Sequence, residues 1–299
     1  DIQVWSSSLQ LLKCDILLST KSAATYGSLN VEKEDVFVFR PTTPGFYNSG
    51  TFFMLLDDPT GEGTRGISLI EQNTNVGGTT LNAGDFLMIQ GSNAYDSNVY
   101  VFETNDVGTG TTSGTVTLLL DGSDSGVGIG NKIDGVDLVE NNMTIGGQAL
   151  TSGQLLISID QDEFVGDNTV YVTDNGIFIF DVVSVSSSSI PNQGVANTSY
   201  FFYASGLSFN TDSEDVNALS LTVASTPPSA TNLSAGENYT EETALNLTDI
   251  VITDPDSTTV TATLTLSDVS AGTLSTGTSG SVTSTFSSGV WTASGAIAD

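Results

Sequence analysis

The sequence has no histidine, one cysteine and only six basic residues, which stand against 35 acidic residues and give a net charge of −29. No lysine or arginine follows Lys132. Nucleic-acid binding requires cationic side chains that neutralise phosphates, so the charge excludes this class of partner. Triad chemistry and most general-base catalysis rely on histidine. We therefore predict a polyanionic protein that is not an enzyme and has no catalytic residues.

Two further absences concern stability and compartment. Cys14 has no second cysteine with which to form an intramolecular disulfide, so stability must come from packing or from a bound metal. No apolar run approaches the roughly 20 residues that cross a membrane, and we expect no membrane insertion. The chain begins with Asp1 rather than methionine, and we interpret it as a processed or excised piece. High net charge favours solubility, and we predict an extracellular or cell-surface location.

The chain does contain repeated alternation of apolar and polar residues. Examples are Asp35–Phe39, Asn98–Phe102 and Thr259–Leu266. These runs are rich in β-branched and aromatic residues and are bounded by Gly, Asn, Asp and Ser, as expected for strands. No stretch shows the i, i+3, i+4, i+7 apolar spacing of an amphipathic helix. The sequence therefore predicts an all-β fold.

The strands recur in a fixed order after an N-terminal segment of residues 1–14. Asn48–Asp58 reads almost letter for letter as Thr112–Gly122. Self-similarity at a spacing of about 70 residues indicates a repeat of roughly four strands. We predict three copies of this repeat, which span residues 15–72, 83–140 and 152–223.

Within each predicted repeat, two strands are easily aligned. The second strands should occupy equivalent positions, and they are Val36–Phe39, Val99–Phe102 and Ile177–Phe180. Each unit is expected to close with a short strand, and these are Gly66–Ile70, Gly135–Leu138 and Val216–Leu221. One such unit cannot bury both faces of its sheet, so the copies should pack on one another. A propeller-like ring, stacked layers and a threefold prism all stay open.

A Pro-rich linker at residues 224–231 separates the repeats from a different C-terminal part, residues 232–299. This part contains Thr-Glu-Glu-Thr-Ala-Leu at 240–245, Asp-Pro-Asp at 254–256, and a Trp291…Ala298-Asp299 ending. On these features residues 226–299 resemble the cadherin-like, immunoglobulin-type modules repeated in tandem in very large bacterial surface and adhesin proteins. The resemblance implies a β-sandwich that is truncated before its last strands. The preceding repeats are similar to strand-rich repeats of secreted bacterial proteins.

In that family, acidic residues near the module ends coordinate calcium. The resemblance carries this role to Glu241, Glu242, Asp254, Asp256 and Asp299. Calcium takes six to eight oxygen ligands, and closely spaced carboxylates supply several of them. Calcium is therefore the expected cofactor. The alternative is that Asp254-Pro-Asp-Ser257 is simply a turn, because Asp and Pro initiate turns on their own.

Other acidic clusters lack the spacing of an EF-hand loop. We interpret them as solvated turns, and they comprise Asp121, Asp124, Asp134, Asp137, Asp160, Asp162 and Glu163. Trp291 lies in an alternating strand and is expected to be a core residue.

These observations predict a non-enzymatic structural or adhesive segment of a large bacterial surface or secreted protein. Its expected partners are other copies or neighbouring modules of the same chain. Two alternatives stay open. An exposed row of aromatic residues in the repeats would favour a glycan-binding module with cell-surface or glycan ligands. An unpaired edge strand, or a module completed by a neighbour's strand, would favour a subunit of an extracellular filament or surface layer.

Overall fold

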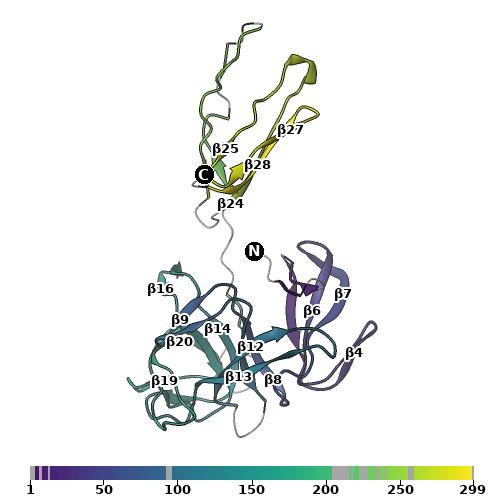
Figure 1. The fold of residues 1–299 in the computed structure, drawn as a ribbon. Helices are drawn as coiled ribbons and strands as arrows, with labels where there is room; N and C mark the ends of the chain where they lie inside the picture. Colours follow the sequence, from purple (N-terminus) through teal and green to yellow (C-terminus); the bar gives the residue numbers. More distant parts are fainter. Residues whose placement is uncertain are drawn as a thin grey trace. The chain divides into compact units, whose positions relative to one another are not determined.

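The structure is a computed structural model, and the chain forms two compact units, Asp1–Leu221 (unit 1) and Thr222–Asp299 (unit 2) (Figure 1). The residues that the structure describes are 4–6, 9–12, 14–91, 96–203, 216, 219–221, 228–233, 236–238, 240, 242–254 and 259–297. They form strands and one short 3₁₀ helix, η2 (Val269–Ala271). The predicted all-β class is confirmed. Within the described residues, no helix is long and apolar enough to span a membrane.

Unit 1 is built on three antiparallel sheets. The first has the strand order β3 (Ile16–Ser19), β6 (Val36–Thr43), β7 (Phe46–Leu56). The second has the order β8 (Thr64–Leu69), β11 (Phe86–Gln90), β12 (Val99–Asp106), β13 (Ser113–Leu120). The third has the order β14 (Ile133–Leu138), β17 (Leu155–Ile159), β20 (Gly176–Ser184), β21 (Val195–Tyr203).

The three sheets share one register at their centre. The partners are Ile16 and Phe39 between β3 and β6, Phe86 and Phe102 between β11 and β12, and Leu155 and Phe180 between β17 and β20. The second strands aligned from the sequence, β6, β12 and β20, therefore have equivalent neighbours, each lying between the first and the last strand of its motif. The number of sequence repeats itself stays a prediction.

The short strands expected to close the units have a different role. β8 pairs with β11, and β14 pairs with β17, so each opens the sheet that follows it. The connection that follows β8 and the one that follows β14 each contain a small hairpin, and each returns the chain to pair antiparallel with the strand it left. Of the third closing segment, Val216–Leu221, only Val216 and 219–221 are described. The Val216 carbonyl accepts a hydrogen bond from Ser158 Oγ at 2.7 Å.

In the described part of unit 1, a two-stranded ladder of β1 (Val4–Ser6) and β2 (Leu9–Gln10) precedes the first sheet, and four small hairpins lie in the connections of the three sheets. They are β4 (Ala24–Tyr26) with β5 (Leu29–Val31), β9 (Thr74–Val76) with β10 (Thr79–Leu81), β15 (Met143–Ile145) with β16 (Gln148–Leu150), and β18 (Glu163–Val165) with β19 (Val170–Val172). Gly77 and Gly78 form the turn of the second hairpin with φ of 55° and 88°. Two consecutive positive φ angles are the mark of the type I′ turn, which fits the twist of a tight hairpin.

The core shows how the sheets are arranged. All five residues of β11 are buried, and successive side chains enter different cores. Phe86 and Met88 belong to the core that contains Val38 of the first sheet. Leu87 belongs to the core that contains Phe180 of the third sheet. Because successive side chains of a strand point to opposite faces, the second sheet lies between the other two. The arrangement left open by the sequence is therefore a succession of packed sheets.

Unit 2 contains smaller ladders. β24 (Thr259–Thr265), β28 (Val290–Ala296) and β27 (Thr285–Ser287) form a sheet, β25 (Thr278–Ser279) pairs with β26 (Val282–Thr283), and β22 (Ser229–Ala230) pairs with β23 (Ile252–Thr253). Ser229 and Ala230 fall in the predicted linker, yet their backbone pairs with Thr253 and Ile252. Trp291 is half-buried, and its Nε1 donates to the Ser275 carbonyl at 3.1 Å.

Candidate functional site

Of the five predicted calcium ligands, the structure describes two, Glu242 and Asp254. Glu241, Asp256 and Asp299 fall outside the described residues. Glu242 is exposed and has a φ of 61°, and Asp254 is half-buried directly after β23. Among the described residues, no group of three or more metal-binding side chains is formed. The two described carboxylates thus do not form a coordination site by themselves, and the calcium site stays a prediction.

Several carboxylates of unit 1 have a structural task at the start of a strand. The backbone N–H of Asp35 donates to the Glu32 carbonyl (3.3 Å), and Asp35 Oδ2 accepts the N–H of Glu32 (2.7 Å). Asp15 makes the same reciprocal pair with Leu12, at 3.0 and 2.8 Å. Gln154 makes it through its amide oxygen before β17. Such a side chain accepts a hydrogen bond from the backbone N–H three residues earlier, a donor that the turn leaves unpaired.

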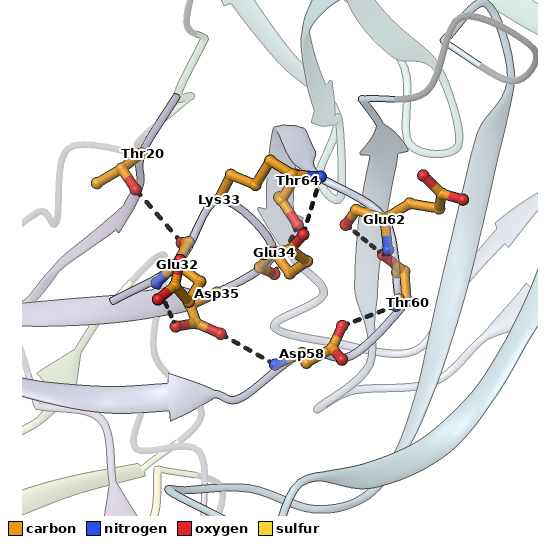
Figure 2. A network of polar contacts seen from close by, with 10 residues as sticks. Thr20, Glu32, Lys33, Glu34, Asp35, Asp58, Thr60, Glu62 and Thr64 are labelled. Atoms are coloured by element: carbon orange, nitrogen blue, oxygen red, sulfur yellow. Dashed lines mark hydrogen bonds and ion pairs between the residues drawn. The ribbon is translucent and has the colours of Figure 1, made fainter. Parts of the chain in front are cut away.

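Figure 2 shows one of these networks, where the turn before β6 meets the loop after β7. Asp35 Oδ1 accepts the backbone N–H of Asp58 at 3.0 Å. The Thr64 hydroxyl donates to the Glu34 carbonyl at 3.0 Å, while Lys33 Nζ lies 2.8 Å from Glu34 Oε1. The Lys33 ammonium lowers the pKa of Glu34. The carboxylates of Asp35 and Glu34 therefore bind backbone N–H groups and a lysine, respectively.

The interpretation of the remaining acidic clusters as solvated turns is wrong for Asp124, Asp134 and Asp137, which are buried. Asp124 Oδ2 accepts from Ser186 Oγ (2.6 Å) and from the Gly194 N–H (2.8 Å). Its Oδ1 accepts from the backbone of Asn192. Buried carboxylates need such partners because desolvation without them is costly. The partners lie more than sixty residues away, which is why local spacing did not reveal them.

One carboxylate titrates far from its ordinary range. Glu140 accepts the backbone N–H groups of Glu71 (2.6 Å) and Gln72 (3.0 Å), and thereby links the ends of β14 and β8. Burial raises the pKa of Glu140 from 4.5 to about 7, with a further contribution from the Glu71 and Asp137 charges. The two hydrogen bonds lower the pKa but do not offset burial. The contact is therefore sensitive to pH near neutrality.

Two arginines are neutralised inside the fold. Arg40 makes a two-pronged contact with Asp15, with Nε 2.9 Å from Oδ1 and Nη2 2.6 Å from Oδ2. Arg65 lies 3.3 Å from Asp134 Oδ1 and 4.0 Å from Asp96 Oδ2. Both guanidinium groups are therefore engaged with carboxylates of unit 1.

An aromatic face lies on the outer side of hairpin β18–β19. Phe164 and Tyr171 are directly opposite each other across the hairpin, with ring centroids 5.0 Å apart, and both are exposed. Their neighbours in sequence, Val165 and Val172, are buried. The Tyr171 hydroxyl donates to Asp162 Oδ2 at 2.8 Å. One side of the hairpin thus presents two aromatic rings to solvent, while the other side contributes buried valines to the hydrophobic core.

A second aromatic pair adjoins the first. Tyr200 and Tyr203 of β21 are in edge contact at 5.2 Å between centroids, and β19 packs against β21. The register of β20 with β21 shifts between Ile177 and Phe178. Such a bulge adds one residue to a strand and turns side chains that are three apart toward the same face. We call Phe164, Tyr171, Tyr200 and Tyr203 the aromatic face.

The sequence contained part of this signal. Tyr171 stands between Val170 and Val172, and in a strand with buried valines the residue between them points the other way. The position of Tyr200 beside Tyr203 depends on the bulge, which no local pattern indicates.

Comparison with known proteins gives no assignment, since no protein-family model, curated protein or solved structure matches the chain. The cadherin-like resemblance therefore stays a prediction.

Proposed function

We propose that this chain is a non-enzymatic structural or adhesive segment of an extracellular or cell-surface bacterial protein. Other copies or neighbouring modules of the same chain are its partners in this proposal. The observation that carries it is the linkage of successive sheets in unit 1, in which β8 and β14 follow one sheet in the chain and pair in the next. Such a chain of sheets shares its cores and resists separation into parts.

The use of the acidic residues also supports the proposal. Catalytic carboxylates usually stand in a cleft with free oxygens toward a substrate. Here Asp35, Asp124 and Asp137 each accept at least two hydrogen bonds from groups of the fold. The hydrogen bonds that these carboxylates accept hold loops to the sheets. This is a stabilising role and requires no chemistry.

Calcium completes the proposal in unit 2. Glu241, Glu242, Asp254, Asp256 and Asp299 are the proposed ligands, on the strength of the resemblance to cadherin-like modules. A divalent cation would relieve the repulsion within a chain of charge −29 and stiffen this unit.

Force spectroscopy tests the structural role. The full chain is held at its two ends and extended, and the unfolding events of unit 1 are counted. Shared cores predict that unit 1 unfolds in one main event, because no sheet can leave without exposing the core of the next. Three separate events of similar low force, one for each sheet, would contradict the proposal.

A further inference from the structure

We propose that the aromatic face of unit 1 is a binding site for a neutral carbohydrate. This inference gives a ligand class to the adhesive function proposed above and rests on it. It begins from exposure, because Phe164 is 60%, Tyr171 46% and Tyr203 51% exposed to solvent. Large apolar groups gathered at one place on a surface mark interaction sites more often than scattered ones do.

The packing of the hairpin does not require these rings. Hairpin β18–β19 is held to the sheet by the buried valines Val165 and Val172, which join the core of Phe178 and Phe180. A cross-strand aromatic pair adds only about 0.2–1 kcal/mol to a hairpin. In hairpin β4–β5 the opposed pair at the middle of the hairpin is Thr25 and Asn30, and the Thr25 hydroxyl donates to Asn30 Oδ1 at 2.8 Å, so a hairpin at this place in a sheet forms without outward rings. The outward rings of β18–β19 are therefore available to a ligand.

Polar groups beside the rings match the hydroxyls of a sugar. The Asp162 carboxylate accepts from the Tyr171 hydroxyl (2.8 Å) and from the Asp174 backbone N–H (3.1 Å). An ionised carboxylate has about four acceptor sites, so Asp162 can also accept from ligand hydroxyls while it stays fixed in place. The Tyr171 hydroxyl uses its one hydrogen in the bond to Asp162, and its oxygen can still accept a hydrogen bond from a ligand hydroxyl.

The combination of flat rings and a fixed acceptor suits a pyranose. One face of a pyranose presents C–H groups with slight positive charge, and the face of an aromatic ring carries negative charge density. The hydroxyls at the rim of the sugar can form charge-assisted hydrogen bonds with a carboxylate. A purely apolar partner would leave Asp162 desolvated and short of donors, which is costly.

Charge selects a neutral ligand. Residues 160–203 contain Asp160, Asp162, Glu163, Asp167, Asp174 and Asp181 and no lysine or arginine. Lys132 meets this segment through its backbone N–H, which donates to Asp160 Oδ1 at 3.0 Å. Uronic, sialic or sulfated glycans would therefore meet like charge at this face. An uncharged sugar avoids this repulsion.

The test is calorimetric titration of the full chain with three neutral probes, cellohexaose, laminarihexaose and maltohexaose, and with polygalacturonate as the anionic comparison. We expect saturable binding of at least one neutral probe. Tyr171→Ala should weaken it at least about tenfold, which corresponds to about 1.4 kcal/mol. Tyr171→Phe should lose less, because it keeps the ring. The matched control is Tyr47→Ala, since Tyr47 is equally exposed at 51% but lies in β7 of the first sheet.

Several results would overturn the inference. The first is that none of the three neutral probes shows saturable binding. The second is that the chain binds polygalacturonate more tightly than the neutral probes, and the third is that wild type and Tyr171→Ala bind the neutral probes equally well. Self-association of the wild type that Tyr171→Ala abolishes would identify a second copy as the occupant and would also overturn it. Unchanged melting temperatures show that the exposed-site variants fold. The force experiment contains no sugar, so a single unfolding event without sugar binding would remove this inference alone.

Discussion

Ser68 and Asp137 are 69 residues apart in the chain, and the Ser68 hydroxyl donates to Asp137 Oδ1 at 2.5 Å inside unit 1. Ser68 is in β8 of the second sheet, and Asp137 is in β14 of the third. Asp137 Oδ2 accepts in addition the backbone N–H of Leu221. One buried carboxylate therefore joins two sheets and the segment that ends unit 1.

This relationship predicts the effect of two substitutions. Asp137→Ala leaves the Ser68 hydroxyl and the Leu221 N–H without their acceptor, and an unsatisfied buried polar group costs about 1–3 kcal/mol. We expect a loss of about 2–4 kcal/mol in the free energy of unfolding of unit 1, measured by urea denaturation. Ser68→Ala removes only a donor and should cost less, about 1 kcal/mol. Equal losses in the two variants would show that Asp137 does not join the sheets as described.

Stability should depend on pH through Glu140. Its folded pKa is about 7 against 4.5, so the folded state binds this proton more tightly than the unfolded state. The contribution to stability is complete below pH 4.5 and is lost as pH rises toward about 7. Asp137 and Glu163, whose pKa values are also raised by burial, act with the same sign.

Glu140→Gln isolates the contribution of this residue. The wild type should lose stability relative to Glu140→Gln as pH rises from 4.5 to 7, measured by urea denaturation at several pH values. Glu103→Gln, which removes a surface glutamate, serves as control. A constant difference between wild type and Glu140→Gln across this range would contradict the assignment.

Two glycines at matching places in the sequence leave room for phenylalanines. A Cβ on Gly114 would lie 2.6 Å from Phe102 Cζ, and one on Gly50 would lie 2.5 Å from Phe39 Cζ. Gly114→Ala should therefore destabilise unit 1 by about 1–3 kcal/mol, the usual cost of overpacking. Gly63→Ala is the control, because its Cβ would meet Lys33 at an ordinary 3.6 Å. Thermal melts in which the two variants lose equal stability would contradict this prediction.

Much of unit 1 was predictable because its strands alternate. Phe39, Phe102 and Phe180 stand at the same place in their motifs. Each pairs with the first residue of its neighbour in the sheet, which is β3, β11 or β17, respectively. A one-residue slip would move each ring to the other face, so the pattern fixes the register. The pairing of β8 and β14 with the following sheets was missed, because alternation describes a strand's faces and not its neighbours.

Burial of the acidic residues could not be predicted from spacing. Asp124 is buried because Ser186, Asn192 and Gly194 supply donors from a distant loop. The aromatic face was half predictable, since the alternation around Tyr171 indicates an outward ring, whereas the approach of Tyr200 to Tyr203 depends on a bulge. The proposed calcium ligands rest on a family resemblance, and their test is experimental.

Calcium should stabilise unit 2. A ligand that binds only the folded state adds about 2.7 kcal/mol at a hundredfold excess over its dissociation constant, and weak extracellular sites have constants of about 10⁻⁴–10⁻³ M. For a unit of this size the gain corresponds to a rise of roughly 10–20 °C in melting temperature. The measurement is scanning calorimetry of the full chain with calcium or with chelator at constant ionic strength. Asp254→Asn combined with Asp256→Asn should abolish the difference, whereas Asp167→Asn combined with Asp181→Asn, which removes the same charge from unit 1, should preserve it. If chelator leaves the wild-type transitions unchanged, the site does not exist and Asp254-Pro-Asp-Ser257 is only a turn.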